Sequence, residues 1–389
     1  MPRFPSPFAQ QIPRSRIREI SELAVGVDGL LPLYFGESNV PTPDFINHAA
    51  KHAIDHGHTF YTHNAGYLDL RRAIADHTHR LHGLAYDPDG EIIVTAGGVA
   101  AIFLALHATL EPGSRAIIVS PCWPNVPAIV RMCGAQPIEV PLSTHAGRFT
   151  LDRQALADAI DPATRVLFVN SPSNPTGWLM THDDQAFLIR LAADHGLCLL
   201  LDIVYERLVY DGSPVAPLPH VAAARDRIVL LHSLSKAYSM TGWRVGYALG
   251  PRPIIEQMTK LQEFVVSHAP APSQRAALAA IQHGEPFVRQ LQQRYRRLRD
   301  IACDRLARCP RIQLVPPQGA FYAFPRIQDL ADSFHFCRRL LATTQVGLAP
   351  GSAFGPGGEA HVRLCFAVDD HILVPALDRL AHFLDHPPP

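Results

Sequence analysis

Seven short apolar runs, separated by longer stretches with helical character, most restrict the fold that this chain can adopt. Each run holds five to seven residues, is rich in Val, Ile and Leu, and in most cases is bounded by Gly, Pro or polar residues. Such runs are typical of buried β-strands. They lie at residues 91–95, 115–120, 136–141, 165–170, 197–202, 227–233 and 245–250. Segments such as 99–110 and 183–195 are predicted helices, so the alternation indicates an α/β fold with a mostly parallel sheet covered by helices on both faces.

The character of the sequence changes near residue 275. A long Arg- and Gln-rich helical stretch follows at 290–309, then short strands near 321–324 and 361–366, and a last helix after Asp369. We therefore predict a large domain over residues 46–275 and a smaller α+β domain over 276–389. Residues 1–45 are expected to form an arm and a helix, starting near Ser15, that pack with the smaller domain. The final prolines, 387–389, are expected to be disordered.

The composition argues against several classes of function. The formal net charge is zero and no long basic run occurs, so a nucleic-acid surface is not indicated. No apolar run is long enough to cross a membrane. The seven cysteines are odd in number and contain no CxxC pair, which fits reduced thiols in a cytoplasm. The Arg-rich start keeps a mitochondrial presequence as an alternative.

Histidines do not supply a metal-binding pattern. His52 and His56 are spaced four residues apart, but no Glu follows His52 in the manner of HExxH. We therefore expect no metal site.

Glycine, aromatic or polar residues follow five of the predicted strands, where ligands of open parallel sheets bind. In chain order they are Gly97 and Gly98, Trp123, Asn174, Asp202 with Tyr205, and Ser233 with Lys236. A glycine pair lets amides approach an anion at a helix N-terminus, although it also serves ordinary tight turns. A carboxylate at the end of a buried run needs a partner. For Asp202, that partner is a protonated pyridine nitrogen, a helix cap or a structural ion pair.

Lys236 is one of only three lysines among the 35 Lys and Arg residues. An amine can form a Schiff base with an aldehyde, whereas a guanidinium cannot. Ser233, Ser235 and Arg244 surround it in sequence and suit a phosphate. The segment predicts a cofactor that carries both an aldehyde and a phosphate, with surface roles for Lys236 and Arg244 as the alternative.

Together these segments resemble the class I/II aminotransferases, fold-type-I enzymes that use pyridoxal 5′-phosphate (PLP), over nearly the whole chain. The matching motifs follow one another in the family's order: Tyr61 with Gly66, Gly97-Gly98, Pro121-x-Trp123-Pro124, Asn174-Pro175-Thr176-Gly177, Asp202-x-x-Tyr205, Ser233-x-Ser235-Lys236, Gly242-Trp243-Arg244-x-Gly246, Gly319-Ala320-Phe321-Tyr322, Pro350-Gly351 and Val362-Arg363. The SxSK block followed by GWRxG is highly specific, and the ordered set is more specific still.

The resemblance implies how PLP would be held. Lys236 would bind it covalently and later move a proton, and Asp202 would pair with the ring nitrogen. The remaining contacts would be Trp123 stacked on the ring, Asn174 and Tyr205 at its 3′-oxygen, and Ser233, Ser235, Arg244 and the amides of Gly98 and Val99 around its phosphate. Tyr61 would reach the phosphate of the neighbouring subunit, which implies a homodimer with shared active sites.

The implied reaction is ping-pong transfer of an amino group from an L-amino acid to a 2-oxo acid. Arg363 would bind the substrate α-carboxylate with a two-pronged contact, assisted by Asn174 and the backbone of Gly36. Relatives that act on acidic substrates can carry a Lys directly after the glycine pair, but this chain has Val99. We therefore expect an amino donor with a neutral or apolar side chain.

Three alternatives to transamination differ in how well they fit these residues. A PLP-dependent C–S β-lyase, or another eliminating enzyme, would use the same Lys236, Asp202 and Arg363. A catalytically silent regulatory module is disfavoured because the catalytic set looks complete and the first forty residues are too few for a DNA-binding segment. A nicotinamide-binding enzyme is disfavoured because no GxGxxG follows the first strand.

Overall fold

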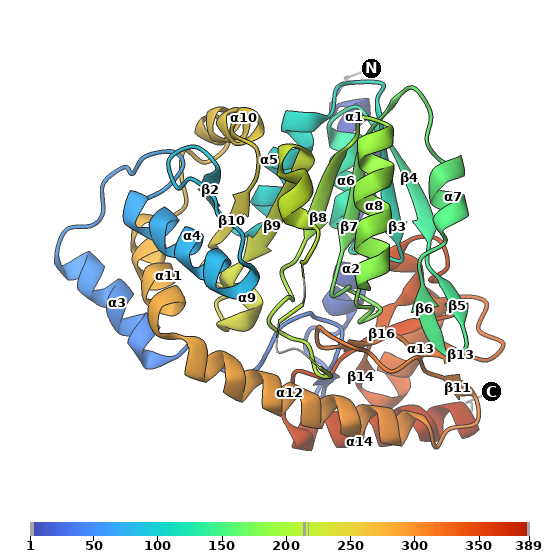
Figure 1. The fold of residues 1–389 in the computed structure, drawn as a ribbon. Coiled ribbons are helices and arrows are strands. Elements are labelled where there is room, and N and C mark those ends of the chain that lie inside the picture. Colours follow the sequence, from blue (N-terminus) through green and yellow to red (C-terminus); the bar gives the residue numbers. More distant parts are fainter. Residues whose placement is uncertain (1–3, 213–214, 217, 387–389) are drawn as a thin grey trace.

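The central element of the computed structural model is a seven-stranded sheet, and residues 4–212, 215–216 and 218–386 are described (Figure 1). Its strands are β2 (Ile92–Thr95), β3 (Arg115–Ser120), β4 (Gln136–Pro141), β7 (Thr164–Asn170), β8 (Cys198–Asp202), β9 (Ile228–Ser233) and β10 (Gly246–Leu249). They lie in the order β2-β10-β9-β8-β7-β3-β4, and only β10 runs antiparallel to its neighbours. The predicted α/β class and mostly parallel sheet are confirmed, with strand ends that differ by one residue or less.

Helices cover both faces of this sheet. One face packs against α4 (Leu68–His82), α8 (His182–Asp194) and α11 (Ala271–His283), and the other against α5 (Gly98–Thr109), α6 (Asn125–Met132) and α10 (Arg252–Glu263). Consecutive strand residues alternate between the two faces, so that Leu199 and Leu201 join one apolar cluster and Leu200 the other. Burial on both faces explains why the strands are continuous apolar runs.

A third apolar cluster joins the start of the chain to its end. The long helix α12 (Glu285–Leu306) leads to it along the lower edge of the molecule in Figure 1. The strand β1 (Leu31–Pro32) pairs in parallel with β14 (Val346–Gly347). A further antiparallel sheet holds β12 (Tyr322–Ala323), β16 (Val362–Cys365) and β15 (Ala349–Pro350). The helices α2 (Arg16–Leu23), α13 (Ser333–Thr344) and α14 (Asp370–Asp385) pack against the strands.

The remaining elements are short or lie at the periphery. They are α1 (Pro7–Gln11), α3 (Asp44–Asp55), β5 (Ser143–His145), β6 (Arg148–Thr150), α7 (Arg153–Asp158), α9 (Leu234–Ala237), β11 (Ile312–Gln313), β13 (Arg326–Ile327) and 3₁₀ turns at Val221–Arg227 and Gly351–Phe354. The domain boundaries at residues 45 and 275 stay predictions. The expectation for residues 387–389 lies outside the described residues.

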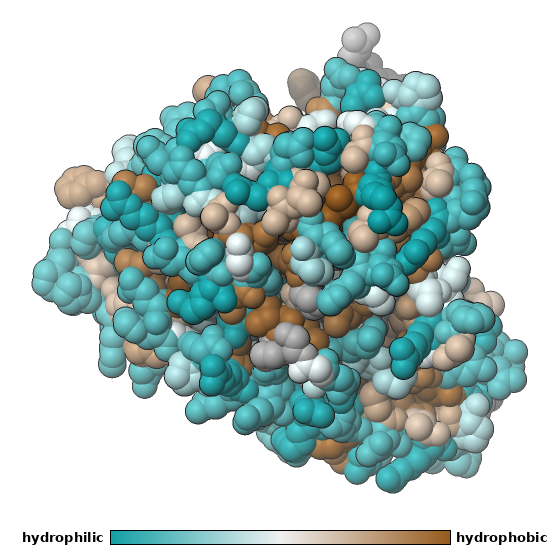
Figure 2. Space-filling model, in the orientation of Figure 1, coloured by the Kyte–Doolittle hydropathy of each residue, from teal (hydrophilic) through white to brown (hydrophobic). Residues whose placement is uncertain are grey.

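Neither a membrane-spanning helix nor a metal-binding cluster occurs within the described ranges. None of the helices there has the length and apolar character needed to cross a membrane. No group of three or more His, Cys, Asp or Glu residues is arranged there to hold a metal ion. Figure 2 shows a mostly hydrophilic surface on one face, with hydrophobic residues gathered toward its middle.

Candidate active site

A cavity of about 690 Å³ lies at the carboxyl ends of β7, β8 and β9, beside the start of α5. Of the residues that the sequence predicts to bind the cofactor or the substrate, all except Tyr61 line it. These residues are Gly36, Gly98, Val99, Trp123, Asn174, Asp202, Tyr205, Ser233, Ser235, Lys236, Arg244 and Arg363. They come from both ends of the chain and from five strand ends, so the fold brings them together at one edge of the sheet.

Lys236 lies in the short helix α9, which begins where β9 ends. The hydroxyl of Ser233 caps this helix by accepting a hydrogen bond from the amide of Ser235 at 3.2 Å. The Lys236 amine donates a hydrogen bond to the carbonyl oxygen of Gly36 at 2.6 Å. Burial, aided by the cations Arg363 and Arg244, lowers the pKa of this amine to about 8. A larger neutral fraction makes it a better nucleophile and base than an ordinary lysine.

Asp202 ends β8 as a buried carboxylate with few partners. Its Oδ1 accepts a hydrogen bond from the amide of Val204 at 3.1 Å. Burial raises the pKa of Asp202 to about 6, although this hydrogen bond and the charges of His232 and Lys236 oppose the rise. No salt bridge to it occurs among the described residues, so neither a structural ion pair nor a helix cap accounts for its position. A cationic ligand would stabilise the charged form.

Arg363 is a buried cation without an anionic partner. Its side chain is 2% exposed, and no carboxylate in the described part of the chain pairs with it. Its Nη1 donates to the Asn174 Oδ1 at 3.0 Å, and its Nη2 donates to the backbone oxygen of Tyr34. Its guanidinium packs over the rings of Tyr322 and Phe354 at 4.6 and 4.9 Å from their centres. A buried cation of this kind calls for an anionic ligand.

Two tyrosines and two asparagines connect these charged groups. The Tyr205 hydroxyl lies 2.7 Å from that of Tyr322. The Asn170 side chain accepts from the amide of Asn174 at 2.8 Å and donates to the backbone oxygen of Asp202 at 3.1 Å. Sequence reasoning missed Asn170, although a polar residue that closes an apolar run was the same signal that selected Asp202.

Closely approaching backbones form a polar pocket at the start of α5. Gly97 has a φ of +90°, and a Cβ there would lie 2.3 Å from the Arg244 Nη2. A Cβ on Gly246 would lie 2.6 Å from the backbone of both Gly97 and Gly98. Glycine alone permits this approach. The first amides of α5, the Ser233 and Ser235 hydroxyls, 2.9 Å apart, and Arg244 then converge on one place that suits a phosphate.

The wall between α2 and α5 is mostly apolar. It contains Ile17, Phe35, Val99 and Ile102, together with the solvent-exposed Arg18. The Arg18 guanidinium lies 5.0 Å from the centre of the Phe35 ring. The sequence did not indicate a role for Arg18, because it belongs to an amphipathic helix far from any strand end.

Tyr61 lies outside the cavity, on the surface. It is 87% exposed, and its ring meets that of His268 edge-on at 5.7 Å. Phe60, Phe264, Val265 and Val266 are also exposed. The Gln262 side chain joins the two segments by donating to the Asn64 backbone oxygen at 2.6 Å. We call the side chains of Phe60, Tyr61, Phe264, Val265 and Val266 the apolar patch.

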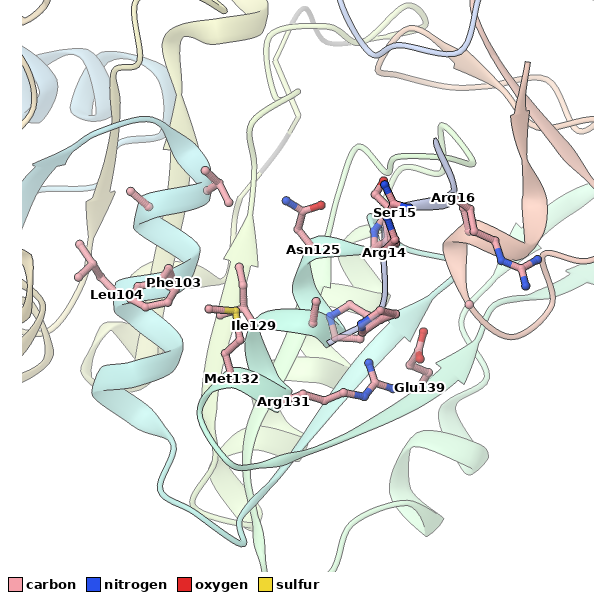
Figure 3. Close-up of a pocket in the computed structure, with 18 of the residues that line it drawn as sticks. Arg14, Ser15, Arg16, Phe103, Leu104, Asn125, Ile129, Arg131, Met132 and Glu139 are labelled. Carbon is pink, nitrogen blue, oxygen red and sulfur yellow. The ribbon is translucent and has the colours of Figure 1, made fainter. Parts of the chain in front are cut away.

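A second cavity, of about 620 Å³, lies beside the apolar patch (Figure 3). Phe103 and Leu104 of α5 and Ile129 and Met132 of α6 line it, with Val265 and Val266 from the patch. Figure 3 shows the segment Arg14–Arg16 on the side facing α5. Its lining is largely apolar, in contrast to the charged first cavity.

Comparisons with known proteins agree with this geometry. The family model for aminotransferase class I and II matches residues 32–380. The chain is 36% identical to a probable N-acetyl-LL-diaminopimelate aminotransferase of Bacillus subtilis over 97% of this chain and 95% of that one. It is also 36% identical to an aspartate/prephenate aminotransferase of Thermus thermophilus over 92% of both chains. The solved structure of Thermus thermophilus aspartate aminotransferase with maleate, 34% identical, superposes with a TM-score of 0.91 over 97% of this chain and 98% of the other.

Proposed function

Because this chain belongs to the aminotransferase class I and II family, we propose that it moves an amino group from an L-amino acid with a neutral or apolar side chain to a 2-oxo acid, in two half-reactions of a ping-pong cycle. The observation that carries the proposal is the meeting of two groups in one cavity. One is the Lys236 amine with its lowered pKa, and the other is the buried Arg363, which has no anionic partner among the described residues.

The cofactor of this family is PLP, and the residues of the cavity fit it. Asp202 has room for a cationic partner, which suits the ring nitrogen. The polar pocket around Gly98, Ser233, Ser235 and Arg244 suits the phosphate. The Arg244 guanidinium lies so close to Gly97 that residue 97 has no space for a side chain. Trp123 lines the cavity and offers a flat face to the ring. Asn174 uses its Oδ1 for Arg363, which leaves its Nδ2 to donate, with Tyr205, to the 3′-oxygen.

Catalysis follows from what these side chains do to the substrate. Bound PLP supplies an electron-poor ring that withdraws electron density from the reacting carbon. Arg363, Asn174 and the backbone of Gly36 would hold the α-carboxylate and so fix the direction of the Cα–H bond. Lys236 would accept the α-proton and return it at the end of the half-reaction. The Gly36 carbonyl, which accepts the Lys236 hydrogen bond, would keep the amine directed toward the substrate.

The side-chain wall of the cavity supports a neutral or apolar donor. Ile17, Phe35, Val99 and Ile102 are apolar, and a hydrophobic substrate side chain would gain from burial against them. The relatives include enzymes named for aspartate, prephenate and diaminopimelate substrates, so the choice rests on the wall of this chain rather than on them. Arg18 is the one cation among the described residues of this wall. It would form an ion pair with an acceptor that carries a distal carboxylate.

We expect alanine, methionine, leucine or phenylalanine to be better donors than aspartate, by about tenfold or more in kcat/KM. The reason is that a distal carboxylate would lose its hydration against Val99 and Ile102. The measurement is a screen of amino donors with pyruvate and 2-oxoglutarate as acceptors, with 2-oxo acid formation followed for each pair.

A higher kcat/KM for aspartate would contradict the donor class. Arg18→Gln would then identify the cause, since it would lower turnover of aspartate and leave that of alanine unchanged. Release of pyruvate and ammonia from cystathionine without an oxo-acid acceptor would instead favour the C–S β-lyase.

The proposed enzyme is a homodimer that shares its active sites. The apolar patch holds five large hydrophobic side chains that are all exposed, and an exposed apolar group of this kind is typical of an interaction surface. Tyr61 belongs to this patch and makes no contact with the cavity of its own chain. A second copy that covers the patch would bring Tyr61 to the phosphate pocket of its partner.

We expect the wild type to have about twice the 42.8 kDa mass of one chain in solution. Replacing both Phe60 and Phe264 by Glu should weaken the dimer by about 100-fold or more, because it buries two charges in an apolar interface. Light scattering after gel filtration measures the mass. Val25→Glu, at an exposed apolar residue away from the patch, is the control and should stay dimeric. A fully active monomeric wild type would refute the shared site.

A further inference from the structure

A buried carboxylate joins two histidines at the edge of the cavity, one of which, His232, lines it. Glu206 Oε2 lies 2.7 Å from Nε2 of His82, the last residue of α4, and its Oε1 lies 3.0 Å from Nε2 of His232 on β9. All three side chains are only 3% exposed. We call these residues the His–Glu–His row.

The row holds Glu206 in its ionised form. A carboxylate can only accept, so both imidazoles present an Nε2–H to it. Burial alone would raise the pKa of Glu206. The attraction of His232 and the hydrogen bonds from His232 and His82 outweigh burial and bring that pKa below its usual range. A buried carboxylate with these partners is stable, and removing one of them leaves an uncompensated charge.

The row reaches the cavity at His232, which lines it between Leu231 and Ser233, whereas Glu206 and His82 are not among its lining residues. Asp202 is in register with Leu231 across β8 and β9, so His232 is the next residue on the opposite face of the sheet. Its ring stacks on Tyr247 at 4.7 Å, and its Nδ1 has no hydrogen-bond partner in the described parts of the chain. Glu206 is therefore its one polar anchor there. Along the chain, Glu206 follows Tyr205 and His232 precedes Ser233.

We propose that Glu206 is a positioning residue for Asp202: it fixes the His232 imidazole behind the edge of the sheet, and this imidazole keeps Asp202 ionised for the ring nitrogen of the cofactor. This inference rests on the proposed function, since it assigns Asp202 to that nitrogen. The row itself touches neither substrate nor reacting atoms.

Other charged or titratable groups also face the row or Asp202. They are His77 and Arg80 from α4, Cys122, Tyr205, Arg207, Lys236, Tyr238, Tyr247, Glu285 and Tyr322. Burial lowers the pKa of His77 to about 4, so this ring is neutral near pH 7. Arg207 is neutralised by two hydrogen bonds to Glu285 at 2.9 and 2.8 Å. Among these groups, His232 is the imidazole whose electrostatic interaction opposes the rise in the Asp202 pKa.

The sign of the expected pH effect follows from Asp202. Burial raises its pKa to about 6, and His232 opposes that rise. Without the charge of His232 the pKa rises further, so that as the pH falls the carboxylate is protonated sooner. The ring nitrogen then loses the negative charge of Asp202 at a higher pH than in the wild type. The cofactor is therefore released at that higher pH.

The test uses the PLP-loaded full-length chain as wild type, Glu206→Gln, His232→Gln and the control His77→Gln. His77 is as buried as His232 but donates no hydrogen bond to Glu206. Visible absorbance of the bound cofactor is titrated against pH, and its dissociation constant is measured by tryptophan fluorescence. We expect Glu206→Gln and His232→Gln to raise the acid midpoint of release by about one pH unit and the dissociation constant at pH 7 by about tenfold, with the control unchanged.

Different results would overturn the proposed function and the proposed role of Glu206. A wild type that takes up no PLP overturns the proposed function. A wild type that binds PLP, with both row variants titrating like it, overturns only the role of Glu206. If Glu206→Gln does not fold, His232→Gln decides alone, since it keeps a hydrogen-bond donor and removes the charge. Equal shifts in the His77→Gln control would assign the effect to packing and overturn the proposal.

Discussion

Replacing Lys236 by Ala is expected to lower kcat/KM for transamination by about 10⁴-fold and to abolish the borohydride-trapped bond between the protein and PLP. The substitution removes an amine that has two roles. It is the nucleophile that binds the cofactor aldehyde, and it is also the base that takes the α-proton. At pH 8 about half of the Lys236 amines are neutral, against roughly one part in 300 for an ordinary lysine. No other lysine lines the cavity, so no neighbour can take over.

Lys236→Arg is the informative control. It keeps the positive charge near Gly36 but cannot lose its proton or bind an aldehyde. We expect it to be as inactive as Lys236→Ala, with an unchanged unfolding temperature. Steady-state kinetics and mass spectrometry of the reduced adduct measure both effects. An adduct that persists on Lys51 or Lys260 in either variant would contradict the assignment.

Replacing Arg363 by Gln is expected to lower kcat/KM for amino acids by about 10²- to 10³-fold, which corresponds to about 3–4 kcal/mol. The substrate carboxylate would lose a charge-assisted, two-pronged contact in a site that excludes water. Arg363→Lys should restore only part of the loss, because an ammonium lacks the planar pair of donors that Asn174 and Tyr34 hold in place.

Two measurements separate this role from a structural one. A primary amine without a carboxylate should react equally slowly with the wild type and with Arg363→Gln. The unfolding temperature of Arg363→Gln should not fall below that of the wild type. The reason is that a buried cation with no anionic partner among the described residues contributes little to folding. A fall of several degrees in unfolding temperature, with the same loss for the amine as for amino acids, would show that Arg363 supports the fold instead.

The strands were predictable because they are buried on both faces. Their side chains cannot alternate between apolar and polar, so each strand is a compact apolar run that stands out in the sequence. The ends were less predictable. Glu91 was assigned to the first strand, but its carboxylate accepts from the Asp87 amide at 2.7 Å and from Arg225, and β2 begins at Ile92. The antiparallel insertion of β10 between β2 and β9 has no local signal at all.

The residues of the cavity also differ in whether the sequence could identify them. Asp202 could be selected because it closes an apolar run, and Lys236 because it is one of only three lysines and lies three residues after such a run. The partners of Arg363 could not, since Tyr34 contributes a backbone oxygen from 329 residues away. The His–Glu–His row could not be predicted either, because His82 ends a helix, His232 lies inside a strand and Glu206 lies in the turn after β8. Only the packing of α4 against the sheet brings them within hydrogen-bond distance.

The pairing of β1 with β14 restricts the order in which the two pockets of the active site can form during synthesis of the chain. Leu31 leaves the ribosome about 300 residues before its partner Val346, a delay of roughly 15–60 s at ordinary rates of synthesis. During that time the seven strands of the sheet can assemble with Asp202 and Lys236 in position. Leu33 donates to Gly347 and accepts from Cys365, so Tyr34, Gly36 and Arg363 come together only once that late segment has emerged. A nascent chain can thus complete the pocket for the cofactor before any pocket for the substrate exists.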